Sequence, residues 1–396
     1  MGNPFSLTHK MTEKKSEPEK KYLFPKEPMR FSMKDFERLL SFCTENHASD
    51  ITIQTSEVVY AEIHGKLAQL TNRKLTNTEV GDLLNNIYGP NGTTQILTGQ
   101  DVDTHYEFKP NRFDRHRFRV NGTGCQVEGH DGIQITLRTI PTDPPSLSDM
   151  HLPDTIINAM APQEGVVYVT GATGSGKSTL LASMIKEIAE DPESHRKILT
   201  YEAPIEFVYD SLNTQSAVIS QSEIPRHLPS FAAGVRNALR RKPRLILVGE
   251  ARDQETIEAV IEACLTGHPV YTTLHSNGVA QTIRRLVGSF PKDEQYGKTI
   301  DIVETLRLII WQKLVPTVDG KRVALREYLV FDEQIRDQLL TIDPEKVTAK
   351  TRELLKKHGQ PMIVDAKKRF KEGMICEREY KIINMTHKRT DYEVTH

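Results

Sequence analysis

The feature that most constrains the fold of this chain of 396 residues is a glycine-rich stretch between an apolar segment and an amphipathic one. Residues 171–178 match the pattern GxxxxGK[ST], whose fixed positions are filled by Gly171, Gly176, Lys177 and Ser178. The preceding residues 166–170 are apolar and β-branched, as is typical of a buried parallel strand. Apolar residues then recur at helical spacing up to an Asp-Pro pair at residues 191–192. A strand, a loop and a helix in this order predict an α/β fold with a mostly parallel sheet.

The loop itself has the composition of a phosphate cradle. Its glycines let successive backbone N–H groups point inward, and the start of the following helix adds unpaired donors and partial positive charge. Lys177 supplies a full charge to the β- and γ-phosphates, and Ser178 offers a hydroxyl ligand to Mg²⁺. An ordinary glycine-rich turn is the alternative interpretation. We predict that ATP and Mg²⁺ bind here, and the candidate binding residues are Gly171, Ala172, Thr173, Gly174, Ser175, Gly176, Lys177, Ser178 and Thr179.

Acidic residues follow two further predicted strands. The apolar residues 245–248 precede Glu250, whose carboxylate is then expected at the carboxyl end of a strand, where parallel sheets bind ligands. From there it can orient a water for attack on the γ-phosphate or hold Mg²⁺ through water. A strand over residues 197–201 ends in Glu202, with Glu206 four residues on. These two acids are compatible with binding Mg²⁺, although the same pattern also occurs in ordinary surface charges.

Two histidines flank another predicted strand, residues 270–274. His268 precedes this strand and His275 follows it. A histidine near a γ-phosphate can donate a hydrogen bond and sense the loss of that phosphate, so both are candidate sensors and His275 is also a catalytic candidate. A purely structural role is the alternative for each. Cys264, on the apolar face of the preceding helix, is predicted to lie in the core.

The rest of the chain divides by composition and pattern. Residues 1–30 combine mixed charge with proline, which predicts a flexible leader or, alternatively, a docking arm. Residues 31–140 predict a small α+β domain, the proline-rich residues 141–150 a linker, residues 151–331 the α/β domain, and residues 332–396 a helical region. Within the α+β domain we predict helices over residues 33–42 and 76–88 and strands over residues 50–54, 58–63, 115–125 and 132–139.

Composition excludes several classes of protein. Lys and Arg number 52 against 53 Asp and Glu, which argues against a dedicated nucleic-acid binder. The mean hydropathy is -0.47, and no apolar run approaches the ~18 residues that a membrane span needs. The cysteines are scattered without a CxxC pair, which argues against structural zinc or a redox dithiol and favours a reducing, cytoplasmic setting. They are Cys43, Cys125, Cys264 and Cys376.

Taken together, these residues resemble the motor ATPases of type IV pili and of type II and type IV secretion. Four boxes of that family are recognisable: Walker A at residues 171–179, an acidic box at 202–206, Walker B at 245–253 and a histidine box at 266–275. Further matches lie at residues 117–121, 137–141 and 312–316. The similarity spans roughly residues 31–385. Residues 48–54, 310–313 and 324–331 most resemble the branch that serves type IVB (Dot/Icm-type) secretion and conjugative plasmid transfer.

The resemblance implies a homohexameric ring. Each chain is then expected to carry a PAS-like N-terminal domain and a RecA-like P-loop ATPase domain, with ATP between them. Arg117, Arg119 and Arg138 match arginines that the family brings to the phosphates, as fixed charged forks. Salt bridges on the strand surface are the alternative for these three.

The resemblance also implies a place in the cell. The family works in the cytoplasm, recruited peripherally to the inner-membrane base of a secretion machine that includes a second, larger ATPase. Neither direct nucleic-acid binding nor membrane insertion is expected. We therefore predict an ATP-hydrolysing motor, and a nucleotide-gated scaffold with incidental hydrolysis or a DNA translocase are the alternatives.

Several residues depart from the family pattern. Ala203 replaces an acid of the acidic box, so its Mg²⁺ role depends more on Glu202 and Glu206. Lys313 stands where pilus motors usually have arginine, and the C-terminal signature of pilus-retraction motors is missing after residue 350. The missing signature counts against a role in pilus retraction.

Overall fold

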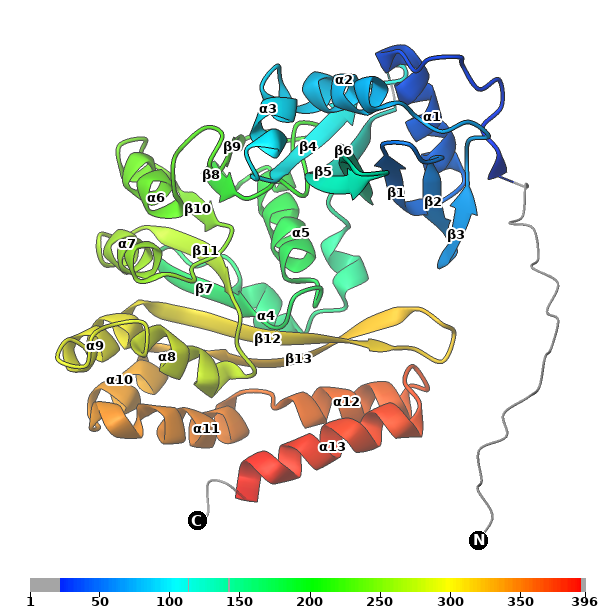
Figure 1. Ribbon diagram of the computed structural model, residues 1–396. Helices are drawn as coiled ribbons and strands as arrows, with labels where there is room; N and C mark the ends of the chain where they lie inside the picture. Colours follow the sequence, from blue (N-terminus) through cyan, green and yellow to red (C-terminus); the bar gives the residue numbers. More distant parts are fainter. Residues whose placement is uncertain (1–21, 113, 142, 393–396) are drawn as a thin grey trace, which may run out of the picture. The chain divides into compact units, whose positions relative to one another are not determined.

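The computed structural model describes residues 22–112, 114–141 and 143–392 (Figure 1). Contacts divide the chain into two compact units, Met1–Thr142 and Asp143–His396, each with its own hydrophobic core. The first is α+β and the second α/β, so the predicted fold class is confirmed. Within the described residues, no helix is both long and apolar enough to cross a membrane.

The N-terminal unit is built on one antiparallel sheet of six strands in the order β3-β2-β1-β6-β5-β4. Apolar side chains of α1 and α2 join those of the sheet in one core. The elements are α1 (Met33–Glu45), β1 (Ala48–Gln54), β2 (Tyr60–Ile63), β3 (Lys66–Gln69), α2 (Asn77–Tyr88), α3 (Gly92–Leu97), β4 (Val102–Phe108), β5 (His116–Val127) and β6 (His130–Ile140).

Part of the segment predicted as a flexible leader is packed in the structure. Residues 1–21 lie outside the described residues, but residues 24–31 pack against the N-terminal unit. Phe24 is buried in its core, and the Phe24 backbone N–H donates to the Leu70 carbonyl at 2.7 Å. Glu27 accepts a hydrogen bond from the Asn72 backbone N–H at 2.8 Å. Isolated aromatic residues between charges and prolines have no periodicity, so the sequence pattern did not reveal this packing.

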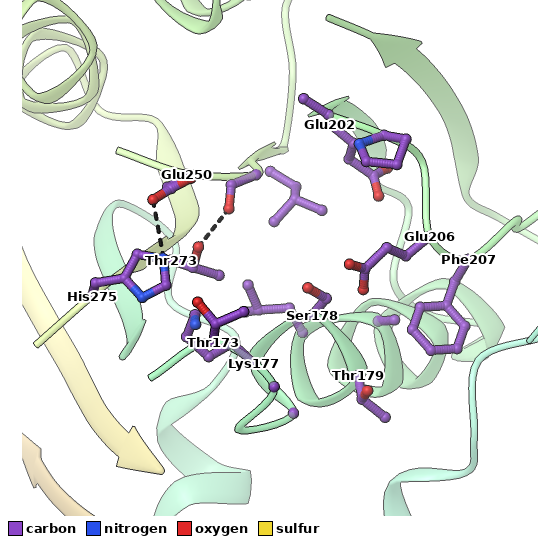
Figure 2. A pocket seen from close by; sticks show the side chains of 18 of the residues that line it. Thr173, Lys177, Ser178, Thr179, Glu202, Glu206, Phe207, Glu250, Thr273 and His275 are labelled. Atoms are coloured by element: carbon purple, nitrogen blue, oxygen red, sulfur yellow. Dashed lines mark hydrogen bonds and ion pairs between the residues drawn. The ribbon is translucent and has the colours of Figure 1, made fainter. Parts of the chain in front are cut away.

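The second unit contains a seven-stranded sheet in the order β13-β12-β7-β11-β10-β8-β9. Only β12 and β13 pair antiparallel; the other neighbours are parallel. The strands are β7 (Gly165–Thr170), β8 (Lys197–Glu202), β9 (Val218–Glu223), β10 (Leu245–Val248), β11 (Pro269–Leu274), β12 (Leu306–Pro316) and β13 (Arg322–Val330). Because β7, β8, β10 and β11 are parallel, their carboxyl ends gather at one edge, and the residues there surround the pocket of Figure 2.

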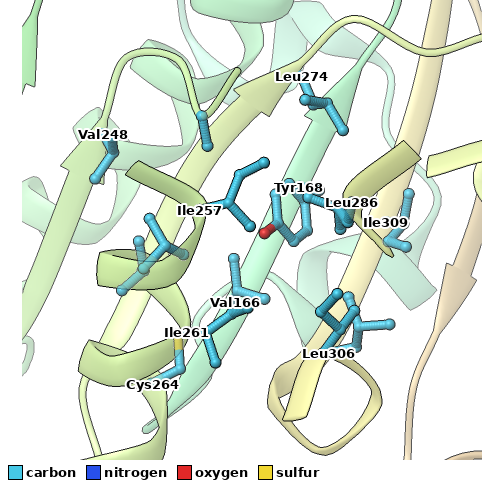
Figure 3. Close-up of a cluster of buried hydrophobic side chains, with 14 of the residues drawn as sticks. Val166, Tyr168, Val248, Ile257, Ile261, Cys264, Leu274, Leu286, Leu306 and Ile309 are labelled. Carbon is cyan, nitrogen blue, oxygen red and sulfur yellow. The ribbon is translucent and has the colours of Figure 1, made fainter. Parts of the chain in front are cut away.

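Helices cover both faces of this sheet, which is why β7, β10 and β11 are buried at every position and mostly apolar. Val166 and Tyr168 of β7 face one cluster, shown in Figure 3, whereas Val167 and Val169 face the other. Cys264 is buried in the first cluster, as the sequence predicted. The helices are η2 (Leu147–Met150), α4 (Asp154–Ala159), α5 (Lys177–Glu190), α6 (Phe231–Leu239), α7 (Gln254–Leu265), α8 (Val279–Val287) and α9 (Gln295–Thr305).

The C-terminal region is helical, and it packs on the β12–β13 hairpin. Met362, Ala366 and Ile375 join Val315 and Leu325 of the hairpin in a small core of their own. Figure 1 shows α12 and α13 side by side along these two strands. The helices here are α10 (Glu333–Leu340), η3 (Pro344–Lys346), α11 (Val347–His358), α12 (Met362–Lys371) and α13 (Glu377–Tyr392).

Candidate active site

A cavity of about 470 Å³ opens at the edge where the parallel strands end (Figure 2). It is lined by side chains from the loops that follow β7, β8, β10 and β11. The sequence-predicted residues among them are Thr173, Gly174, Gly176, Lys177, Ser178, Thr179, Glu202, Glu206, Glu250 and His275. Residues distant in the sequence therefore meet in one pocket because their strands run in the same direction.

The loop between β7 and α5, residues 171–179, is called the glycine loop below. Gly171 has φ of 147° and Gly176 has φ of 82°, a region that favours glycine. A Cβ on Gly171 would overlap the carbonyl oxygen of Gln312. Gly176 caps α5 without a side-chain hydrogen bond, so no capping side chain competes with a ligand for the first N–H groups of α5. A phosphate is the ligand that such a helix start favours.

Lys177 is half-buried within the glycine loop. Its Nζ donates to the carbonyl oxygens of Gly171 at 3.1 Å and Ala172 at 2.9 Å. Burial lowers the pKa of Lys177 from its ordinary value, while the nearby carboxylates of Glu250 and Glu206 oppose that shift. The ammonium group is thus held at the loop and faced by acids across the cavity, and it can pair with the negative charge of a bound polyphosphate.

Glu250 and His275 form a pair at the ends of β10 and β11. Their Oε1 and Nε2 atoms are 3.3 Å apart (Figure 2). Thr273 of β11 fixes the backbone beside Glu250, because its hydroxyl donates to the Gly249 carbonyl at 2.6 Å. A carboxylate held in this way can orient a water molecule in the cavity. The sequence analysis did not single out Thr273; a polar residue inside an apolar strand was the available signal.

The two acids that follow β8 differ in environment. Glu202 is buried and accepts hydrogen bonds from the Thr200 hydroxyl at 2.7 Å and from Gln221 Nε2 at 3.1 Å. Glu206 lines the cavity from the loop and lies near enough to Lys177 to act on its charge. Among the described residues, no group of three or more His, Cys, Asp or Glu side chains could hold a metal on its own. A cation here would need ligands from the Ser178 hydroxyl and from a bound phosphate.

His268 is not at this site, which corrects its predicted position. It precedes β11, and the cavity lies at the other end of that strand of six residues, on the order of 20 Å away. There its Nδ1 contacts the Thr266 hydroxyl and the Ala263 carbonyl, both at 3.2 Å. A residue before a strand and one after it lie at opposite edges of the sheet, so only His275 can reach the cavity within this unit.

The three predicted arginines lie in the N-terminal unit, and each pairs with an acid on the neighbouring strand. Arg117 contacts Glu107 at 3.2 Å, Arg119 contacts Asp103 at 2.8 Å, and Arg138 contacts Asp50 at 2.8 Å. The strand salt bridges that the sequence analysis left open are therefore present.

A glycine loop with its lysine, opposed by a glutamate at the end of a parallel strand two places away in the sheet, defines a P-loop ATPase. The chain belongs to the family of type II/IV secretion system proteins, whose family model matches residues 29–359. It is 36% identical over 276 residues to a twitching motility protein of Neisseria gonorrhoeae, covering 69% of this chain and 70% of that protein. It is 32% identical over 303 residues to the type IV pilus retraction ATPase PilT of Pseudomonas aeruginosa, covering 76% and 84%.

Solved structures agree with this family. The X-ray structure of the Legionella pneumophila ATPase DotB matches with a TM-score of 0.87 and 66% identity, covering 92% of this chain and 99% of that one. The pilus retraction motor PilT with bound ADP matches with a TM-score of 0.76 and 30% identity, covering 87% and 95%. The resemblance seen in the sequence is thus confirmed, and the chain is an ATPase of the secretion and pilus motor class.

Proposed function

We propose that this chain is the ATP-hydrolysing motor of a type IVB (Dot/Icm-like) secretion or conjugative transfer system, working as a homohexamer. The main observation in support of ATP hydrolysis is the cavity in which Lys177 of the glycine loop faces Glu250. The similarity to the ATPase DotB over 92% of the chain supports the choice of branch within the family.

In this proposal the triphosphate lies in the glycine loop, the Walker A box, with its γ-phosphate toward Glu250. A second cavity of about 640 Å³ adjoins the first and takes the base and ribose. The two cavities share Gly176, Thr179, Leu314 and Arg322 in their walls, so one nucleotide can occupy both. Apolar side chains of the second cavity, among them Met150 and Val323, suit the faces of a planar base.

The residues present fit a magnesium ion that accompanies the nucleotide. The Ser178 hydroxyl would bind it directly, and the carboxylates of Glu202, Glu206 and Glu250 would bind it through water. Such an ion would neutralise charge on the β- and γ-phosphate oxygens.

Glu250 then supplies the base for hydrolysis. Its carboxylate accepts a proton from water as the water oxygen forms a bond to the γ-phosphorus, and the bond to the β–γ bridging oxygen breaks to release ADP. Lys177 remains beside the charge that develops on the leaving phosphates. His275 lies 3.3 Å from Glu250 and holds its carboxylate in place. When the γ-phosphate departs, the hydrogen-bond partners of the imidazole change.

We further propose that phosphate loss drives rigid-body movement in the ring, which is recruited peripherally from the cytoplasm to an inner-membrane base that includes a second, larger ATPase. Arg117, Arg119 and Arg138 take part only if phosphate replaces their carboxylate partners during turnover. If so, Arg138→Ala slows hydrolysis more than Asp50→Ala does.

Glu250→Gln tests the chemistry. The amide keeps the size of the side chain but cannot accept the proton, so ATP binding should persist while steady-state hydrolysis falls by at least about 100-fold. Glu255→Gln, on an exposed residue of α7, is the matched control and should hydrolyse at the parental rate. Hydrolysis by Glu250→Gln at the parental rate would show that the assigned base is wrong.

Transport separates a motor from a nucleotide-gated scaffold. A motor carrying Glu250→Gln binds ATP but should fail to support secretion or plasmid transfer in cells. A scaffold with incidental hydrolysis would still support it. DNA-stimulated hydrolysis that weakens with salt would instead favour a translocase.

A further inference from the structure

A chain of buried polar side chains connects the glycine loop with the C-terminal helices. Gln312 of β12 donates from Nε2 to the Ser175 carbonyl at 2.6 Å, and its Oε1 accepts from Arg326 Nε of β13 at 2.8 Å. The Arg326 backbone N–H donates to Asp365 Oδ2 of α12 at 2.9 Å. Three hydrogen bonds thus connect the glycine loop with α12. The residues Gln312, Arg326, Asp365 and Arg369 are called the network below.

The side chains of Arg326 and Arg369 also hydrogen-bond to the backbone of the segment around η2. Arg326 Nη1 donates to the Met150 carbonyl at 2.8 Å, and Arg369 Nη2 donates to the His151 carbonyl at 3.3 Å. Arg369 is ion-paired with Asp365 at 3.4 Å, one turn away on α12. Asp365 is therefore the carboxylate that both arginines face.

These side chains are buried, which is costly for charged groups. Arg326 is 3% exposed, Asp365 5% and Arg369 7%. Burial lowers the pKa of Arg326 to about 10, and Asp365 opposes that shift. Apolar residues of similar size would often give equal or greater stability at such positions. A buried ionic network is therefore weak evidence for a role in stability, and this one also hydrogen-bonds to the glycine loop.

Gln312 contacts the glycine loop with both its backbone carbonyl and its side chain. Its carbonyl lies against Gly171, where a Cβ would overlap it, and its Nε2 would lie 2.9 Å from a Cβ on Gly176. The Ser175 carbonyl that it binds immediately precedes the glycine that caps α5. A change of the Gln312 side chain therefore removes a hydrogen bond to the loop that is to hold the phosphates. The bonds described for Gln312, Arg326 and Asp365 involve neither Glu250 nor His275.

We propose that Asp365 is a positioning residue for ATP binding, which acts through Arg326 and Gln312 to keep the glycine loop in its phosphate-binding shape. Arg326 and Gln312 also line the second cavity, so Asp365, which is not in its wall, separates positioning from direct contact with the nucleotide. Through these residues the C-terminal helical region sets the affinity for ATP. This inference rests on the proposed function, because it requires ATP to bind in the glycine loop. It predicts an effect on KM rather than on kcat, since the network contacts the loop and leaves the hydrolytic pair alone.

Three variants of the full chain test this network. Gln312→Ala removes both contacts of the amide, and Gln312→Glu can still pair with Arg326 but cannot donate to the Ser175 carbonyl. Asp365→Asn keeps an acceptor for the Arg326 N–H but removes the charge that both arginines face. We expect each to raise KM for ATP, and Kd for a non-hydrolysable ATP analogue, by about 10-fold, which is about 1.4 kcal/mol, with kcat within about 2-fold of the parent.

Val364→Ala is the matched control, because Val364 lies on α12 and is 52% exposed. It should leave KM, kcat and the thermal midpoint unchanged. If the network variants lower the thermal midpoint but keep the parental KM and Kd, the network is only structural and the proposal is overturned. Should Gln312→Ala fail to fold, Gln312→Glu and Asp365→Asn decide the matter.

The parent protein separates this inference from the proposed function. If the parent does not bind the analogue, or if Lys177→Ala binds it as tightly as the parent, the proposed site itself is wrong. If the parent binds, Lys177→Ala does not, and the network variants bind normally, only the present inference fails.

Discussion

Lys177 shows at the scale of a single residue how the site is prepared for its ligand. Its ammonium group donates to two carbonyl oxygens of its own loop, so it is held in place before a phosphate arrives. Replacement of Lys177 by alanine should weaken ATP binding by about 10- to 100-fold, because hydrogen bonds to charged groups contribute ~1.5–3 kcal/mol. Equilibrium titration with a fluorescent ATP analogue measures this loss.

Lys186 supplies the control for that measurement. It lies on the same helix, and its Nζ donates to the Pro144 carbonyl at 3.2 Å. Lys186→Ala removes the same charge from α5 but should keep the parental affinity. Equal affinities for Lys177→Ala and the parent would contradict a phosphate site at this loop.

Residues of the nucleotide site could be predicted from the sequence where they belong to a local pattern. The glycine loop and Glu250 each follow an apolar strand, so pattern and position agree before any contact is known. Thr273 and Gln312 lie within stretches that match the family, but their roles depend on bonds to the Gly249 and Ser175 carbonyls that only the folded sheet creates. Strand direction alone separates the two histidines, because His268 precedes β11 and His275 follows it at the cavity.

At the scale of elements, the capping box of α2 predicts a dependence on pH. Glu79 accepts hydrogen bonds from the backbone N–H of Thr76 at 3.1 Å and of Phe31 at 3.0 Å, and pairs with Arg73 at 2.6 Å. Burial alone would raise the pKa of Glu79, but these partners together lower it from 4.5 to about 2. Because the folded pKa is depressed, the stabilisation is present above about pH 4.5 and is lost as the pH falls toward 2.

Glu79→Gln should therefore reduce local stability at pH 7 by about 2 kcal/mol, and the difference from the parent should shrink below pH 4.5. Hydrogen–deuterium exchange of peptides covering residues 24–31 and 76–88 reports this difference within the full chain. Asp82 lies on the same helix, and Asp82→Asn, which removes its exposed ion pair with Arg30, should change exchange little. A pH-independent difference for Glu79→Gln would contradict the assigned ionisation.

Elements with a strong period were predicted, and those stabilised by a neighbour were not. The helix over residues 76–88 and the strands over 166–170 and 270–274 have local signals and form as expected. The strands β3 and β4 were not predicted from the sequence. Both are edge strands with mixed polar sequences, and each pairs with only one other strand of the sheet.

At the scale of the whole molecule, the proposed ring predicts the mass of the particle in solution. One chain has a mass of 45.0 kDa, so six chains give about 270 kDa. We expect this species in the presence of ATP and Mg²⁺, measured by light scattering after size exclusion. The Glu250→Gln variant should retain the ring longest because it cannot hydrolyse the ligand. A single-chain mass under every nucleotide condition would contradict the hexamer.

A crystal structure of the chain with a non-hydrolysable ATP analogue and Mg²⁺ tests the central claim most directly. The account predicts the β- and γ-phosphates within hydrogen-bond reach of Lys177 Nζ and the N–H groups of residues 174–178, with the Glu250 carboxylate beside the γ-phosphate. A triphosphate bound elsewhere, or Glu250 turned away from it in every protomer, would contradict the account.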